Sequence, residues 1–214
     1  MAISLAAGLV QPALAQDTGS AGIGALKRQI EQDRTRAIAL LRAALVNAES
    51  MDVPDRLWVM SQLAKNLGKA LKYEEALVVV RQAEKEAEAI PVQRVHFVRQ
   101  AMMHYRSMDK NQLALAEYAK IAPLLPTLSG KSGELEGHIE AAHAWAAGGT
   151  VMSGLGQLPE AMELLTRAMR VFDANPGQAK GQADGLSQIA HVHFKTGDTD
   201  AAVREVQRLS LIHI

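Results

Sequence analysis

Two histidines, His191 and His193, are the first residues whose type and spacing suggest chemistry, because imidazole binds metal ions and transfers protons. Residues two apart on a helix face different sides, so this pair cannot easily hold one ion. His138 and His143 are five apart and are no better placed. The sequence contains no Cys and no H-E-x-x-H motif. We therefore predict no metal site and no cofactor.

Two glycine-containing segments invite a nucleotide-binding interpretation. The segment SGKSG at 129–133 has the Gly-Lys-Ser of a phosphate loop, but the Gly required five residues before Gly130 is Leu125. We find no strand pattern ahead of it. In AAGGTVMSGLG, Gly148 and Gly149 fit close helix contact and the last glycines fit a turn. Both segments favour a structural role over phosphate binding.

Catalytic nucleophiles and paired acids are the remaining possibility for chemistry. There is no thiol and no G-x-S-x-G elbow in the sequence. Glu74 and Glu75 fall in the opening turn of an expected helix, where negative charge suits the helix dipole. Glu84, Glu86 and Glu88 are most simply a solvated helix face. We predict that the protein has no catalytic residues and is not an enzyme.

Composition limits the classes of partner and fold. Lys and Arg number 23, as do Asp and Glu, so the chain lacks the basic excess typical of nucleic-acid binding. Aromatic residues make up only 4%, and strands favour aromatic and β-branched side chains. No apolar run approaches the roughly 20 residues of a membrane-spanning helix. These features favour a helical protein. They predict that it does not bind nucleic acid and that this chain has no membrane-spanning helix.

An alanine recurs after each expected turn, and it sets the period of the chain. It occurs at positions 37, 76, 114, 161 and 202, with spacings of 39, 38, 47 and 41 residues. A larger residue follows four positions later, and usually a small one follows three positions after that, which places the set on one helix face. We predict that these short side chains let neighbouring helices approach closely. The expected structural repeat positions are Ala76, Ala83, Ala114, Trp145, Gly149, Ala161, Ala168 and Ala202.

Each of these helices is preceded by a turn and by another segment of helical periodicity. The repeating unit is therefore a helical hairpin of about forty residues, and the longest irregular segment is expected at 123–133. One hairpin cannot bury its apolar face alone, so hairpins must stack. The predicted fold is all-α, a right-handed α-solenoid of about four to five stacked antiparallel helical hairpins.

The pattern resembles the tetratricopeptide repeat (TPR) family, whose signature is W-x₂-L-G-x₂-Y…A-x₃-F…P. The matching unit reads Trp145, Gly148, Gly149, Met152, then Gly156, Ala161 and Leu165. The units are longer than the 34 residues of the family, and its terminal Pro is displaced to Pro91 and Pro176. The resemblance implies a scaffold that binds proteins or peptides through a concave groove lined by the first helix of each hairpin.

On that resemblance, basic and polar residues of the first helices form the candidate groove, while acids are scarce there. We expect a mildly cationic groove that accepts an acidic or C-terminal carboxylate segment of a partner protein. An ordinary solvated helix face with a few Lys and Arg remains the alternative. The candidate binding residues are Gln62, Lys65, Lys69, Arg99, Arg106, His143, Gln188, His191 and Lys195.

The two ends of the chain differ from the middle, and they suggest a signal peptide at the N-terminus and a non-native or truncated tail at the C-terminus. Residues 1–15 end in Ala13-Leu14-Ala15 after an apolar stretch, as a secretory signal peptide does. We expect residues 16–32 to be a linker or N-terminal cap, 33–209 the repeat domain, and 210–214 a non-native or truncated tail of a longer bacterial chain. The predicted location is periplasmic or secreted, with a cytoplasmic one as the alternative. A second functional hypothesis is the periplasmic sensory region of a membrane signalling protein of the diguanylate cyclase or histidine kinase type.

Overall fold

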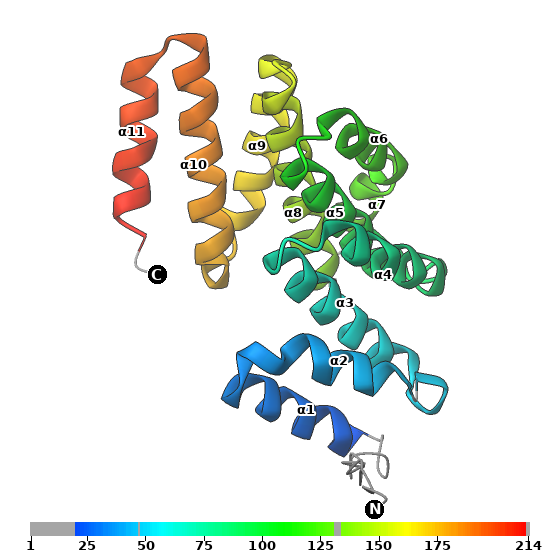
Figure 1. The fold of residues 1–214 in the computed structure, drawn as a ribbon. Helices are drawn as coiled ribbons and strands as arrows, with labels where there is room; N and C mark the ends of the chain where they lie inside the picture. The colour runs from blue at the N-terminus through cyan, green and yellow to red at the C-terminus, as the bar shows by residue number, and fades with distance from the viewer. Residues whose placement is uncertain (1–19, 47, 131–133, 213–214) are drawn as a thin grey trace, which may run out of the picture. The chain divides into compact units, whose positions relative to one another are not determined.

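The computed structural model describes residues 20–46, 48–130 and 134–212, and every regular element in this part of the chain is a helix (Figure 1). This confirms the predicted all-α fold. None of the described helices has the length and apolarity needed to cross a membrane. The expected signal peptide at 1–15 lies outside the described residues, as do Lys131 to Gly133 of the SGKSG segment and residues 213–214 of the expected tail.

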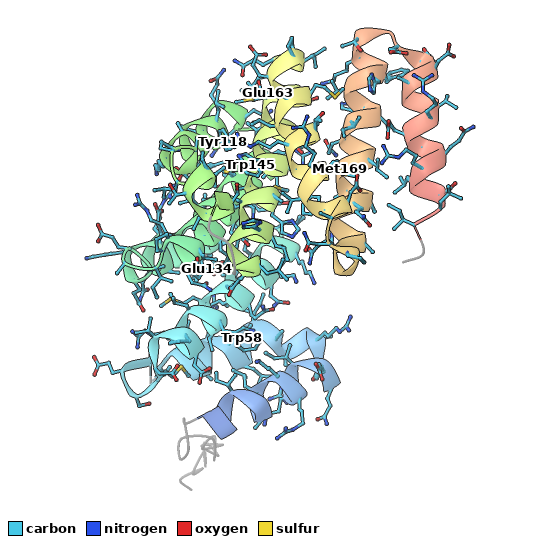
Figure 2. All side chains as sticks on the ribbon, turned by 180° about the vertical axis from the view of Figure 1, so that it is seen from behind. Trp58, Tyr118, Glu134, Trp145, Glu163 and Met169 are labelled. Atoms are coloured by element: carbon cyan, nitrogen blue, oxygen red, sulfur yellow. The ribbon has the colours of Figure 1, made fainter. Side chains whose placement is uncertain are left out.

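The chain divides into two compact units, residues 1–63 and 64–214, which we describe separately. In the first unit, the buried side chains of Ile23, Leu26 and Leu41 form the apolar faces of the first two α-helices. The Lys27 ammonium lies 4.7 Å from the centroid of the Trp58 ring, which is labelled in Figure 2. The described elements are α1 (Ser20–Gln32), η1 (Arg34–Arg36), α2 (Ala37–Val46), η2 (Ala48–Ser50) and most of α3 (Val53–Lys69). Residues 20–32 are thus helical, and their role as a cap stays a prediction.

The second unit is a series of helical hairpins. The end of α3 leads into α4 (Tyr73–Glu86), and three further pairs follow: α5 with α6, α8 with α9, and α10 with α11. Each first helix packs against the preceding hairpin, as in α5 against α4 and α10 against α9 (Figure 1). The remaining elements are α5 (Pro91–Ser107), α6 (Asn111–Ile121), α7 (Leu125–Gly130), α8 (Leu135–Gly154), α9 (Leu158–Asp173), η3 (Pro176–Gln178), α10 (Ala179–Thr196) and α11 (Thr199–Ser210).

All four hairpin turns have the same backbone structure. Each contains one residue with positive φ, five positions before the recurring alanine: Leu71, Asp109, Gly156 or Gly197. The backbone N–H of the residue after it donates a hydrogen bond to the carbonyl five residues earlier, as Lys72 N does to Leu67 O at 2.9 Å. This is the hydrogen bond that closes a Schellman motif at the end of a helix. This bond satisfies a carbonyl at the end of the first helix and reverses the chain. Two of the four turns use a non-glycine residue in this conformation, which the sequence alone did not indicate.

Short side chains let the helices of this unit approach closely. A Cβ on Gly149 would lie 2.8 Å from Leu165 Cγ and 2.9 Å from the carbonyl oxygen of Ala161. A Cβ on Gly148 would lie 2.6 Å from the Tyr118 ring. The structure buries the expected repeat positions, which are Ala76, Ala83, Ala114, Trp145, Gly149, Ala161, Ala168 and Ala202. Larger side chains at these helix contacts would force the backbones apart.

The segment expected to be irregular at 123–133 contains the short helix α7, so that part of the prediction was wrong. Leu125 is fully buried and Leu128 is 4% exposed, and both belong to the main apolar core. Their three-residue spacing gives the segment one apolar face that packs against α8. Pro126 and Ser129 are residue types common in loops, so the apolar face formed by the leucines was not recognised from the sequence.

Candidate binding site on the first helices of the hairpins

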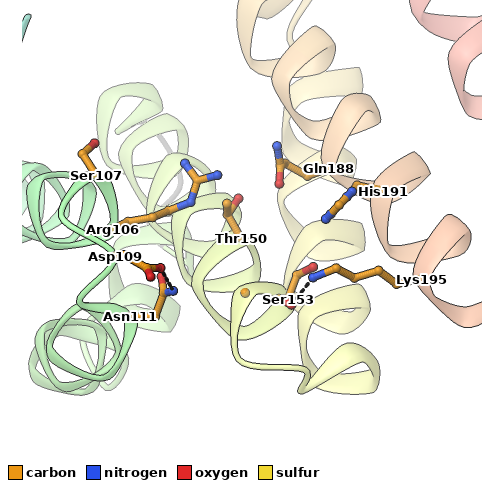
Figure 3. A pocket seen from close by; sticks show the side chains of 10 residues that line it. Arg106, Ser107, Asp109, Asn111, Thr150, Ser153, Gln188, His191 and Lys195 are labelled. Carbon is orange, nitrogen blue, oxygen red and sulfur yellow. Dashed lines mark hydrogen bonds between the residues drawn. The ribbon is translucent and has the colours of Figure 1, made fainter.

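A pocket of about 470 Å³ lies between the ends of α5, α8 and α10 in the second unit (Figure 3). We call it the polar pocket. Its lining residues are Arg106, Ser107, Asp109, Asn111, Thr150, Ser153, Gly154, Gln188, His191 and Lys195. Helices α5, α8 and α10 are the first helices of three successive hairpins, the helices on which the sequence analysis placed its candidate residues.

The turn between α5 and α6 forms one side of the polar pocket. Arg106 lies in the last turn of α5, and Asp109 has a φ of 58°. Asn111 opens α6, and its Nδ2 donates to Asp109 Oδ1 at 3.2 Å. The hairpin turn therefore brings a guanidinium and a carboxylate to the same side of the pocket.

Helix α8 contributes hydroxyl groups from its last two turns. Thr150 Oγ1 donates to the carbonyl of Ala146 at 2.8 Å, which satisfies it within its own helix. Ser153 is only 2% exposed, and its Oγ has no hydrogen-bond partner within the described residues. A buried hydroxyl without a partner loses the hydrogen bonds that water would provide, so this group is available to an acceptor in the pocket.

Helix α10 supplies the opposite side of the pocket. Gln188, His191 and Lys195 are spaced three and four residues apart, which places them on one helix face (Figure 3). The Lys195 ammonium donates to the Ser153 carbonyl at 2.8 Å and so stabilises the C-terminal end of α8. Within the described part of the chain, the side chains of Gln188, His191 and Arg106 form no hydrogen bond or ion pair.

Arg99, also on α5, differs from Arg106 because it has a buried partner. Its Nε donates to Glu140 Oε1 at 2.7 Å, and its NH2 group lies 3.3 Å from Oε2. Burial by itself raises the pKa of Glu140, but the Arg99 charge and the hydrogen bonds from His96 and Arg99 outweigh it, so that the pKa falls to about 2. The charge of Arg99 is therefore largely balanced by Glu140 before any ligand arrives.

His143 lies on α8 and is half-buried. Its ring centroid is 5.0 Å from that of Phe172 on α9. Burial lowers the pKa of His143, and the nearby Arg99 charge lowers it further. The imidazole is consequently neutral at pH 7, and its ring packs toward α9 rather than lining the polar pocket.

Of the nine candidate binding residues, the structure brings four together. Arg106, Gln188, His191 and Lys195 line the polar pocket. Lys65 and Lys69 are exposed on α3, and Gln62 is half-buried on the same helix. None of these three lines the pocket. Their part in binding stays a prediction.

Several residues of the site were missed by the sequence analysis. Asp109 and Asn111 fall in the turn expected before the recurring alanine at 114, to which the sequence analysis gave no binding role. Glu140 is 41 residues from Arg99, which is close to the repeat spacing, so the two occupy comparable places on successive first helices. Arg81 on α4 and Glu117 on α6 likewise pair across the second helices at a separation of 36 residues. Opposite charges separated by one repeat are the signal that could have revealed these pairs.

Comparison with known proteins gives a clear result for the fold. No protein-family model matches the chain, and no curated protein sequence matches it. Among solved structures, kinesin light chain TPR-like repeats from Podosopora anserina align with 90% of this chain and 93% of their own, at 18% identity and a TM-score of 0.57. The chain has the TPR-like fold.

Two further structures agree with this TPR-like assignment. BtubC (BKLC) from P. vanneervenii matches 94% of this chain and 91% of its own, at 17% identity and a TM-score of 0.64. MamA from Desulfovibrio magneticus RS-1 matches 92% of this chain and 97% of the solved chain, at 14% identity and a TM-score of 0.57. Identities this low establish the architecture of stacked hairpins and leave the function to be argued from the site.

Proposed function

We propose that the protein is a non-enzymatic scaffold that binds a protein or peptide segment across its first helices, with an acidic group of the partner held in the polar pocket. The observation that carries the proposal is the set of Arg106, Gln188 and His191, which line one pocket and have no partner within the described residues. Unpaired side chains on two hairpins, Arg106 on α5 and the other two on α10, can hold an extended ligand through charge-assisted hydrogen bonds. The TPR-like fold supports this use, because stacked repeats expose extended binding surfaces.

The structure changes which basic residues the proposal depends on. Arg99 is paired with Glu140, so reversing its charge would disturb a buried pair as well as any ligand. Arg106 is exposed and unpaired, so its substitution tests binding with little risk to the fold. Arg170 is an exposed arginine of the second helix α9 and provides a matched control.

The experiment compares fluorescein-labelled nonapeptides of Gly, Ser and Asn that carry either Glu-Glu or Lys-Lys at the centre, each with a free or amidated C-terminus. Fluorescence anisotropy should show tighter binding of the acidic peptides, and added salt should weaken it. Arg106→Glu should abolish the preference, whereas Arg170→Glu should retain it. Equal binding of acidic and basic peptides, or an unaffected Arg106→Glu variant, would refute the proposal.

A sensory role within a longer signalling protein is a second candidate. The polar pocket, at about 470 Å³, falls in the size range of small-molecule sites, which is what a sensory region would require. Sequencing the gene on both sides of this chain tests the hypothesis. A spanning helix followed by a cyclase or kinase domain would support it, and flanking sequence without either would oppose it.

A further inference from the structure

The lining of the polar pocket limits the chemistry of its ligand. All ten residues are polar, charged or glycine, and none has a hydrocarbon side chain. Typical small-molecule pockets are mostly apolar, and peptide side chains that anchor in pockets are often apolar as well. An apolar side chain would find no favourable contact here. The ligand group must be strongly hydrophilic.

The pocket supplies more hydrogen-bond donors than acceptors. Arg106 offers a guanidinium fork, Gln188 an amide, and Lys195 the N–H groups not directed at the Ser153 carbonyl. His191 adds a ring nitrogen on the α10 side. Ser153 lines the pocket, and its buried hydroxyl has no partner among the described residues. An occupant rich in acceptor oxygens would satisfy this set.

We propose that the polar pocket binds a phosphoryl group, carried either by a phosphorylated residue of a peptide or by a small molecule. A carboxylate has two oxygens, whereas a phosphoryl group presents three peripheral oxygens and close to two negative charges at pH 7. Donors converge here from α5, α8 and α10, which surround a tetrahedral group better than a planar one. The volume of about 470 Å³ also leaves room for the group that carries the phosphate. The peptide source rests on the function proposed above.

Substitution of Asp109 tests whether the group bound in the polar pocket is an anion or a cation. Its carboxylate is the single acid in the lining, and one of its oxygens accepts a hydrogen bond from Asn111. Asp109→Asn removes a charge that opposes an anion, and Asn tolerates the left-handed backbone conformation of this residue. A bound anion should therefore bind more tightly to this variant, whereas a bound cation should bind less tightly.

The experiment measures binding of four probes by isothermal titration calorimetry: inorganic phosphate, and one hydrophilic nonapeptide with phosphoserine, Glu or Ser at its centre. The phosphoserine peptide should bind about tenfold more tightly than the Glu peptide. Arg106→Gln should weaken phosphoserine binding about tenfold, Ser153→Ala severalfold, and Asp109→Asn should strengthen it severalfold. Arg170→Gln is the matched control and should have no effect. Circular dichroism establishes that each variant is folded.

The outcomes separate this inference from the proposed function. Equal binding of Glu and phosphoserine peptides would overturn the phosphoryl assignment and leave the acidic-peptide scaffold intact. Binding of phosphate that Arg106→Gln weakens, with no gain from any peptide, would support the phosphoryl site and count against the peptide scaffold. Failure of all four probes, or weaker phosphoserine binding to Asp109→Asn, would overturn the inference.

Discussion

The ion pair between Arg99 and Glu140 gives the sharpest prediction about stability. Glu140 has a side chain only 12% exposed, and its pKa falls from 4.5 to about 2 in the folded protein. Burial opposes ionisation, and the Arg99 charge with the hydrogen bonds from His96 and Arg99 reverses that effect. Each tenfold change in proton affinity corresponds to about 1.4 kcal/mol, so the ionised carboxylate contributes about 3 kcal/mol at pH 7.

The sign of the pH dependence follows from the lowered pKa. Above pH 4.5 the carboxylate is ionised in both the folded and unfolded states, and its full contribution is present. As the pH falls from 4.5 toward 2, the unfolded chain binds a proton that the folded protein does not, so stability is lost across this range. At pH 3 only about 1.4 kcal/mol of the contribution should remain.

The assay is urea denaturation of the wild-type protein and Glu140→Gln at pH 7, 4 and 3. The variant should be about 3 kcal/mol less stable at pH 7, and the difference should shrink to just over 1 kcal/mol at pH 3. Glu163→Gln changes an exposed glutamate of α9 and serves as the control, with a difference near zero at every pH (Figure 2). A Glu140→Gln difference that is small or independent of pH would refute the argument.

Three other predictions test the packing, the turns and the buried histidine of the TPR-like unit. Gly148→Ala places a Cβ 2.6 Å from the Tyr118 ring and should lower the free energy of unfolding by about 1–3 kcal/mol, whereas Gly154→Ala meets its neighbours at 3.5 Å and should not, as urea denaturation would show. Leu71→Gly should raise the free energy of unfolding by up to about 1 kcal/mol, because Leu71 is 72% exposed and has a φ of 60°; an unchanged melting temperature would count against strain there. Burial lowers the pKa of His104, as it does that of His143, so the wild-type protein should lose stability as pH falls below 6.5, and thermal melts of His104→Leu should show a smaller loss.

Most of the fold could be predicted from the order of small and large residues. The alanines at 76, 114, 161 and 202 recur at spacings of 38, 47 and 41 residues, and all four are buried. Local sequence also placed the turns, because Gly156 and Gly197 suit positive φ. Leu71 and Asp109 adopt the same conformation without that signal, because the stacked helices on either side require the turn there.

Less of the candidate site could be predicted, because it depends on distances between hairpins. Arg99 and Arg106 are equivalent basic residues in sequence, seven positions apart on one helix. Glu140 faces only the first of them, so one guanidinium is paired and the other is available to a ligand. Nothing local to either arginine distinguishes them.

The sequence by itself determined that this chain forms helical hairpins that stack, because helical periodicity and short side chains are properties of neighbouring residues along one chain. Only the tertiary structure decided which polar groups are available for binding. Ser153 is buried, and the unpaired Arg106 lies across the pocket from His191, because three hairpins meet at that place (Figure 3). Pairing of charges and hydrogen bonds requires contact within a few ångströms, and contacts between residues some forty positions apart are made only by folding.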